Sequence, residues 1–238
     1  NINESHFIVV GLGGVGSWVA ESLARTEVGH ITLIDLDNVA ESNTNRQIQA
    51  LDGNYGKPKV QALAERISLI NPACKVECIE DFIEPDNVEE ILPKDGIVID
   101  CIDNVRAKAA MINTALKRGQ TIITCGAAGG RKDPLRIKID DLALTKGDPL
   151  LSRVRARLRK EYGFPKKSVS GKVTKFKVPA VFSDEEVLQP NEQCELQTMG
   201  GLSCAGYGSG MVVTASVGLA ASALALRNVA AGNKIIRI

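Results

Sequence analysis

Short apolar runs rich in β-branched residues alternate with longer amphipathic segments along the first half of the chain. The short runs, which are typical of buried strands, occupy residues 7–10, 31–34, 75–79, 97–100 and 121–125. The longer segments, which are typical of helices, occupy residues 16–25, 59–70, 86–92 and 105–118. Strands that alternate with helices predict βαβ units and a largely parallel sheet. We therefore expect a doubly wound, Rossmann-like α/β fold with helices on both faces of the sheet.

The pattern changes after residue 126. A strand-like run covers residues 135–139, and the segment after Pro149 places apolar residues on one helical face, namely Leu150, Leu151, Val154 and Leu158. Residues 211–226 are small, apolar and uncharged. Because a stable membrane span needs about 20 apolar residues, this stretch predicts a buried C-terminal helix instead. We expect one domain over residues 1–238, with its core in 1–145 and 178–238 and a basic helix and loop excursion at about 150–178.

Composition narrows the function classes. The chain has 238 residues, 29 basic and 28 acidic, so its net charge of +1 excludes a wholly basic nucleic-acid-binding protein. Aromatic residues make up 4%, which disfavours base-stacking platforms for single strands. The six cysteines form no C-x-x-C pair, so we expect neither a disulfide scaffold nor a zinc ribbon. Residues 1–6 are polar and unlike a signal peptide, which adds to the expectation of a cytoplasmic protein. Peripheral membrane association through the apolar helix stays open.

A glycine-rich turn follows the first predicted strand and opens the first predicted helix. Gly11, Gly13 and Gly16 have the spacing that lets a backbone approach phosphate groups at a helix N-terminus. This motif predicts nucleotide binding. Asp35 stands near the position where NAD-binding folds place the acid that binds the ribose, so glycine spacing alone leaves a dinucleotide-binding protein open.

Three charged residues shift the prediction toward a triphosphate. Arg46 and Lys59 lie close in sequence to the glycine turn, and Asp103 follows a predicted strand. The charge of a triphosphate must be offset before an anion can attack it, and a carboxylate can hold Mg²⁺ between phosphates. Each residue also has a structural interpretation: Arg46 as a surface ion pair, Lys59 as a helix residue, and Asp103 as the N-cap of the next helix. Their joint occurrence favours ATP.

The same motifs resemble a known family. Residues 11–16, 35, 43–47, 56–59 and 100–103 resemble the nucleotide site of the ubiquitin-activating-enzyme-like superfamily, the ThiF/MoeB/HesA group, whose members adenylate a carboxylate with ATP. The resemblance implies that Arg46, Lys59 and Asp103 are catalytic, with Asp103 as the Mg²⁺ ligand and Asp35 at the ribose. The ATP-binding residues that it implies are Gly11, Gly13, Gly14, Gly16, Asp35, Asp37, Asn43, Asn45, Arg46, Gln47, Lys59, Asp103 and Asn104.

Segments in the second half are similar to one branch of that superfamily, the tRNA threonylcarbamoyladenosine dehydratases. These segments span residues 129–134, 148–150, 181–185 and 211–215. The resemblance implies an ATP-dependent enzyme that adenylates the carboxylate of threonylcarbamoyladenosine in tRNA and promotes ring closure with loss of AMP. Two alternatives stay open. One is an enzyme that adenylates the C-terminal glycine of a ubiquitin-like sulfur carrier, although such enzymes commonly carry zinc motifs that this chain lacks. The other is a dinucleotide-binding Rossmann protein.

The resemblance also gives the basic segment a function. Between residues 153 and 177 the chain has ten basic residues and one acidic residue, Glu161. Binding of tRNA phosphates is expected for Arg153, Arg155, Arg157, Arg159, Lys160, Lys166 and Lys167. The alternative interpretation is a solvated helix face with a charged loop.

Further partners are implied only by the resemblance. Members of the superfamily often supply an arginine across a dimer, so we expect a homodimer. A sulfur-relay protein is a candidate partner. Cys204 is flanked by small residues and is a candidate reactive thiol, but an inert thiol is favoured because intramolecular cyclisation needs no enzyme nucleophile.

Overall fold

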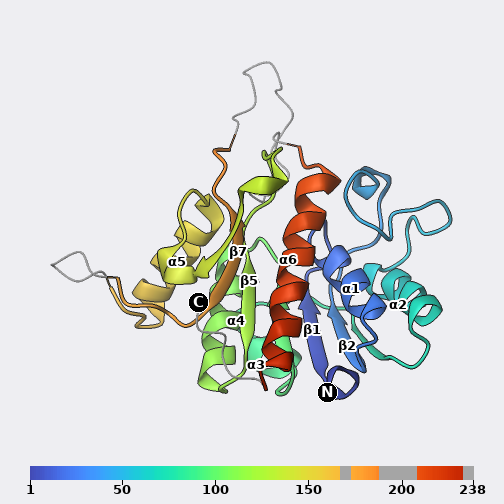
Figure 1. Cartoon of the computed structure of the whole chain (residues 1–238), viewed down its shortest axis with the longest axis horizontal. Coiled ribbons are helices and arrows are strands. Elements are labelled where there is room, and N and C mark those ends of the chain that lie inside the picture. The colour runs from blue at the N-terminus through green and yellow to red at the C-terminus, as the bar shows by residue number, and fades with distance from the viewer. Residues whose placement is uncertain (167–172, 188–207, 233–238) are drawn as a thin grey trace.

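A seven-stranded sheet forms the centre of the computed structural model, which describes residues 1–166, 173–187 and 208–232. The strands follow the order β3-β2-β1-β4-β5-β7-β6 across the sheet, of which Figure 1 labels β2, β1, β5 and β7. In chain order they are β1 (His6–Val10), β2 (His30–Ile34), β3 (Lys75–Ile79), β4 (Ile97–Asp100), β5 (Ile122–Cys125), β6 (Ile137–Asp141) and β7 (Pro179–Ser183). All neighbours are parallel except β6, which runs antiparallel to β7. The predicted, mostly parallel α/β fold is confirmed.

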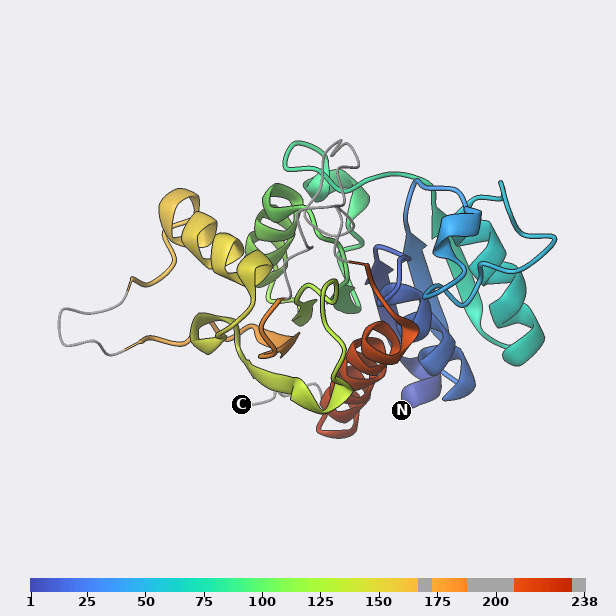
Figure 2. The ribbon, with the colours of Figure 1, turned by 90° about the horizontal axis from the view of Figure 1, so that it is seen from above.

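Helices cover both faces of this sheet (Figures 1 and 2). They are α1 (Gly16–Arg25), α2 (Lys59–Ile70), α3 (Val88–Ile91), α4 (Val105–Lys117), α5 (Pro149–Glu161) and α6 (Met211–Ala230). Alternate residues of β1 enter different cores, because successive side chains of a strand point to opposite faces. Phe7 and Val9 pack with residues of α1, α2 and α6, whereas Ile8 and Val10 pack with residues of α3, α4 and α5.

Some boundaries differ from the sequence-based prediction. Strand β7 was not predicted; all five of its residues are buried, so they show no alternation of polar and apolar positions. Strand β6 begins two residues later than predicted, because Pro134–Arg136 forms a 3₁₀ turn whose first residue follows the cap Asp133. The helix predicted over residues 86–92 is reduced to α3.

Helix α6 is the apolar C-terminal helix, and it is part of the core. It is long and apolar enough to cross a membrane, but 56% of its most apolar window is buried inside the protein. It packs closely on α1 at Gly218, where a Cβ atom would lie 2.6 Å from the carbonyl oxygen of Val15. Only glycine allows this approach of the two helices.

Helix α5 contains the first half of the predicted basic excursion. Its apolar residues Leu150, Leu151, Val154 and Leu158 are all buried, as their shared helical face predicts. They belong to the same core cluster as the buried residues of α4. The helical part of the excursion is therefore joined to the body of the domain.

Candidate active site

A cavity of 540 Å³ lies at the carboxyl ends of the central parallel strands. It forms where β1 has β2 on one side and β4 on the other, so the loops that follow β1 and β4 diverge there. Open α/β sheets bind ligands at this kind of switch point. Eleven of the thirteen predicted ATP-binding residues line the cavity: Gly11, Gly13, Gly14, Asp35, Asp37, Asn43, Arg46, Gln47, Lys59, Asp103 and Asn104.

The glycine turn connects β1 to α1 beneath the cavity. Gly11 has a φ of +85°, and a Cβ atom there would lie 2.8 Å from Cγ2 of Ile102. A Cβ atom on Gly16 would lie 1.8 Å from the carbonyl oxygen of Gly11, so Gly16, which does not line the cavity, is required for packing of the turn. Helix α1 begins without a side-chain cap. The backbone N–H groups of Ser17 and Trp18 already donate to the carbonyl oxygens of Gly13 and Val15, so the amides of the glycine turn before them are the ones placed to serve an anion.

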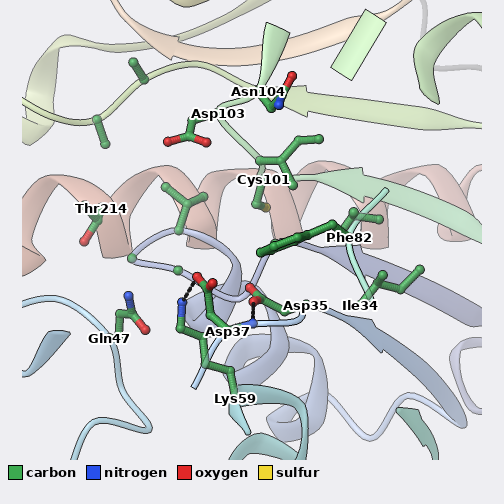
Figure 3. Close-up of a pocket in the computed structure, with 18 of the residues that line it drawn as sticks. Ile34, Asp35, Asp37, Gln47, Lys59, Phe82, Cys101, Asp103, Asn104 and Thr214 are labelled. Atoms are coloured by element: carbon green, nitrogen blue, oxygen red, sulfur yellow. Dashed lines mark hydrogen bonds and ion pairs between the residues drawn. The ribbon is translucent and has the colours of Figure 1, made fainter. Parts of the chain in front are cut away.

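Asp35 connects the glycine turn to the loop after β2. Its side chain is buried and accepts a hydrogen bond from the backbone N–H of Leu12 at 2.6 Å. It accepts a second one from the backbone N–H of Asp37 at 2.8 Å (Figure 3). Burial raises the pKa of Asp35, while the nearby Lys59 ammonium and the two N–H donors oppose this shift. The carboxylate thus stands at the floor of the cavity in a fixed orientation.

Lys59 carries a positive charge at the wall of the cavity. It is the first residue of α2 and only 5% exposed, and its Nζ atom lies 2.8 Å from Oδ2 of Asp37 (Figure 3). Its backbone N–H also donates to the carbonyl oxygen of Asp37. The two bonds position the ammonium group at the cavity while Asp37 itself remains exposed.

The loop that carries Arg46 is tied to the rest of the site by side chains. The Arg46 guanidinium donates to the carbonyl oxygen of Ser42 and to Oδ1 of Asn45, and its own carbonyl oxygen accepts from Nε1 of Trp18 at 2.9 Å. Asn45 does not line the cavity; its Nδ2 atom donates to the carbonyl oxygen of Ser209 at 2.8 Å, just before α6. Asn45 thus connects this loop to the start of α6.

The sequence left open whether Asp103 caps the helix after it or binds a metal ion, and the structure assigns the cap to Asn104. The N-cap of α4 is Asn104, whose Oδ1 atom accepts from the backbone N–H groups of Arg106 and Ala107. Asp103 is exposed, and within residues 1–166, 173–187 and 208–232 its carboxylate has no hydrogen bond or ion pair. A carboxylate without such partners, at a cavity large enough for a nucleotide, suits Mg²⁺, which commonly takes one or two carboxylates together with substrate phosphates. The described residues form no cluster of three or more metal-binding side chains.

Other parts of the cavity wall were not predicted. They comprise the segment after β3, the segment after β5 and the start of α6, that is, residues 81–84, 126–129, Ser209 and Thr214. Phe82 lies beside Cys101 at the apolar side of the cavity (Figure 3). The rule that ligands lie at the carboxyl ends of parallel strands would have identified the first two segments.

The predicted tRNA-binding residues of α5 and of the segment after it divide into two groups. Three have partners inside the chain: Arg155 contacts Thr145, Arg157 pairs with Glu161 at 3.3 Å, and Arg159 donates to the carbonyl oxygen of Pro165 and lies over the ring of Phe176. The exposed residues are Arg153, Lys160 and Lys166. Lys167 and Cys204 lie outside the residues that the structure describes.

Comparisons with known proteins agree with this geometry. A model of the ThiF family matches residues 1–228. The tRNA threonylcarbamoyladenosine dehydratase of Escherichia coli K12 is 44% identical over 237 residues, covering 96% of this chain and 87% of that protein. The enzyme of the same name from Haemophilus influenzae is 43% identical over 222 residues, covering 91% and 82%. The crystal structure of E. coli TcdA, a tRNA N6-threonylcarbamoyladenosine dehydratase, in complex with ATP matches with a TM-score of 0.83 and 42% identity, covering 98% and 88%.

Proposed function

This chain belongs to the ThiF family, and on that premise we propose that it is an ATP-dependent tRNA threonylcarbamoyladenosine dehydratase. The likeness to enzymes of that name over nearly its whole length is the observation that carries the proposal. The chemistry of the cavity supports it, because two cations, the Asp103 carboxylate and the glycine turn before α1 border a space of 540 Å³. A nicotinamide dinucleotide does not require that combination.

The proposed reaction has two steps. An oxygen of the threonylcarbamoyl carboxylate attacks the α-phosphorus of ATP, and pyrophosphate leaves. An atom of the same modified nucleoside then attacks the acyl carbon, the ring closes, and AMP leaves with the former carboxylate oxygen. A proton is lost in the closure, so the nucleoside loses one water overall. Adenylation is needed because a carboxylate has no leaving group of its own.

The residues of the cavity have distinct proposed roles in the first step. The amides of the glycine turn and the side chains of Arg46 and Lys59 would bind the phosphates and offset the charge that develops during attack. Asp35 would accept hydrogen bonds from the ribose hydroxyls. Asp103 would bind Mg²⁺, which supplies further neutralisation of the phosphates when it is bound. Asp37, Asn43, Gln47 and Asn104 would line the nucleotide.

The assembly proposals concern contacts beyond this chain. We propose that exposed cations of α5 bind tRNA phosphates and that the active unit is a homodimer in the cytoplasm, where tRNA is found. Cys204 remains a candidate thiol, and a sulfur-relay protein remains a candidate partner. Support for tRNA as substrate comes from the names of the relatives.

ATP–pyrophosphate exchange tests the proposed function. Exchange should be stimulated by tRNA that carries threonylcarbamoyladenosine and not by the same tRNA without the modification. Stimulation by a ubiquitin-like carrier protein instead would assign the chain to carrier activation. Binding of NAD without any exchange would assign it to the dinucleotide-binding class.

A further inference from the structure

A buried ion pair lies directly behind the turn that carries Asp103. It joins Asp100, the last residue of β4, to Lys108 in the second turn of α4, with Nζ and Oδ1 at 2.7 Å. Both side chains are fully buried, at 0% exposure. Neither residue lines the cavity, so neither can contact a ligand bound there.

Thr124 of β5 completes the arrangement. Its hydroxyl donates to Oδ2 of Asp100 at 2.6 Å, and it accepts from Nζ of Lys108 at 3.2 Å. Oδ1 of Asp100, the oxygen that pairs with Lys108, also accepts from the backbone N–H of Ile102 at 3.3 Å. Ile102 immediately precedes Asp103, so this triad of Asp100, Lys108 and Thr124 connects β4, β5 and α4 to the turn that presents Asp103.

Stability alone does not account for the triad. Burial of two charges carries a large desolvation cost, and apolar residues of similar volume at such a position are often as stabilising as the ion pair or more so. Burial raises the pKa of the Asp100 carboxyl, against the opposing effect of Lys108. What an apolar pair cannot supply is an acceptor for the Ile102 N–H at a fixed place. The polar groups therefore specify the path of the β4–α4 turn.

We propose that Asp100, Lys108 and Thr124 are positioning residues that hold the β4–α4 turn so that the Asp103 carboxylate meets the metal–ATP complex. The inference rests on the proposed ATP-dependent function. Residues that orient a metal ligand typically change metal affinity by about 10- to 100-fold when they are replaced. The triad should therefore affect binding of ATP in the presence of Mg²⁺ and leave binding of the free nucleotide unchanged.

Paired substitutions test this without leaving an uncompensated buried charge. In Asp100→Leu with Lys108→Met, the acceptor of the Ile102 N–H is lost. We expect about tenfold weaker binding of ATP with Mg²⁺, less than twofold change in EDTA, and faster hydrogen exchange of the Ile102 amide without any ligand. In Asp100→Asn with Lys108→Met, an oxygen acceptor remains, so exchange and affinity should return toward those of the wild type.

A single substitution and a control pair complete the set of variants. If the variant with Asp100→Leu and Lys108→Met does not fold, Thr124→Val, which removes only the hydroxyl, should weaken ATP binding with Mg²⁺ by about threefold. This is less than the roughly 10- to 100-fold effect of losing a residue that orients a metal ligand, because the Asp100 acceptor of the Ile102 N–H stays in place. A control pair, Glu21→Leu with Arg66→Met, removes the ion pair of the buried Glu21 carboxylate with Arg66, away from the cavity. The second partner of Glu21, Arg25, is exposed to solvent, so this control should leave ATP binding unchanged.

Two results would overturn the inference. One is equal loss of affinity in Mg²⁺ and in EDTA, and the other is unchanged Ile102 exchange and ATP affinity in the folded Leu–Met or Thr124→Val variant. Neither ATP binding nor hydrogen exchange of the Ile102 amide needs tRNA. Failure of the proposed function would therefore appear separately, as wild-type protein that binds ATP but shows no ATP–pyrophosphate exchange with modified tRNA.

Discussion

Lys59 presents a charge to the cavity from a nearly buried position. Its ammonium group pairs with the carboxylate of Asp37, whose side chain is 55% exposed. A ligand in the cavity can therefore still reach the ammonium group. Sequence reasoning identified Lys59 from its place near the glycine turn, but the ion pair with Asp37 depends on the fold. Such a charge contributes most where phosphate charge develops in a transition state.

Replacement of Lys59 should therefore affect catalysis more than folding. For Lys59→Met we expect ATP–pyrophosphate exchange to fall by about 100-fold, the effect typical of removing one transition-state donor. The matched control is Lys57→Met, since Lys57 lies two residues before Lys59, pairs with Glu65 and does not line the cavity. Similar exchange rates for the two variants would remove Lys59 from the mechanism.

Two glycines of the same turn should differ in their effect on stability. Gly16→Ala forces a Cβ atom against the carbonyl oxygen of Gly11 and should lower the free energy of unfolding by about 3 kcal/mol. Gly13→Ala meets no atom of the chain within 4 Å, so a change within about 0.5 kcal/mol is expected. Urea denaturation measures both. Equal stability of the two variants would contradict the packing role of Gly16.

His6 gives the fold a dependence on pH at the edge opposite to the cavity. Its ring stacks on that of His30 with centroids 3.7 Å apart, and burial, followed by the effect of His30, lowers the pKa of His6 below 6.5. The unfolded chain therefore binds the proton more readily, and the free energy of unfolding should fall as pH drops through 6.5. Chemical denaturation at pH 7.5 and 5.5 measures this. His6→Gln should reduce the difference; an unchanged difference would exclude His6 as its source.

At the scale of elements, hydrophobic period and caps predicted most of the core. The observed bounds of β3, β4, α1 and α2 equal the predicted ones, because each has a strong pattern between clear breaks. Strand β7 was missed for two reasons. Its five residues are all buried, so polar and apolar positions do not alternate, and its first residue is Pro179, which has no backbone N–H to donate within a sheet. Its partner β5 is 54 or more residues earlier in the chain, so the local sequence pattern cannot predict that the two strands pair.

Helix α5 separates cations that are available for tRNA from cations that are engaged within the chain. Arg153 and Lys160 lie two turns apart on one exposed side, whereas Arg157 pairs with Glu161. Arg153→Ala with Lys160→Ala should reduce the slope of log affinity for tRNA against log salt by about 2, one for each phosphate contact. Arg157→Ala should change it less. ATP affinity should be the same in all three proteins; an unchanged slope in the double variant would exclude this face.

At the scale of the whole molecule, the cavity is built from the loops that follow five parallel strands. Residues 11–14, 35–37 and 103–104 could be predicted because each forms a recognisable motif. Residues 81–84 and 126–129 carry no such motif, and they reach the cavity only because the sheet brings the ends of β3 and β5 to the same edge. Asn45 was predicted at the nucleotide, but its contact with Ser209 is a property of the tertiary fold.

Mass spectrometry of the substrate decides whether this protein dehydrates threonylcarbamoyladenosine in tRNA. Purified tRNA that carries threonylcarbamoyladenosine is incubated with this protein and ATP–Mg²⁺, digested to nucleosides and weighed, and AMP is quantified in parallel. We expect the modified adenosine to lose the mass of one water and one AMP to form for each nucleoside converted. An unchanged nucleoside mass in the presence of bound ATP, or AMP formation without conversion, would contradict the proposed function.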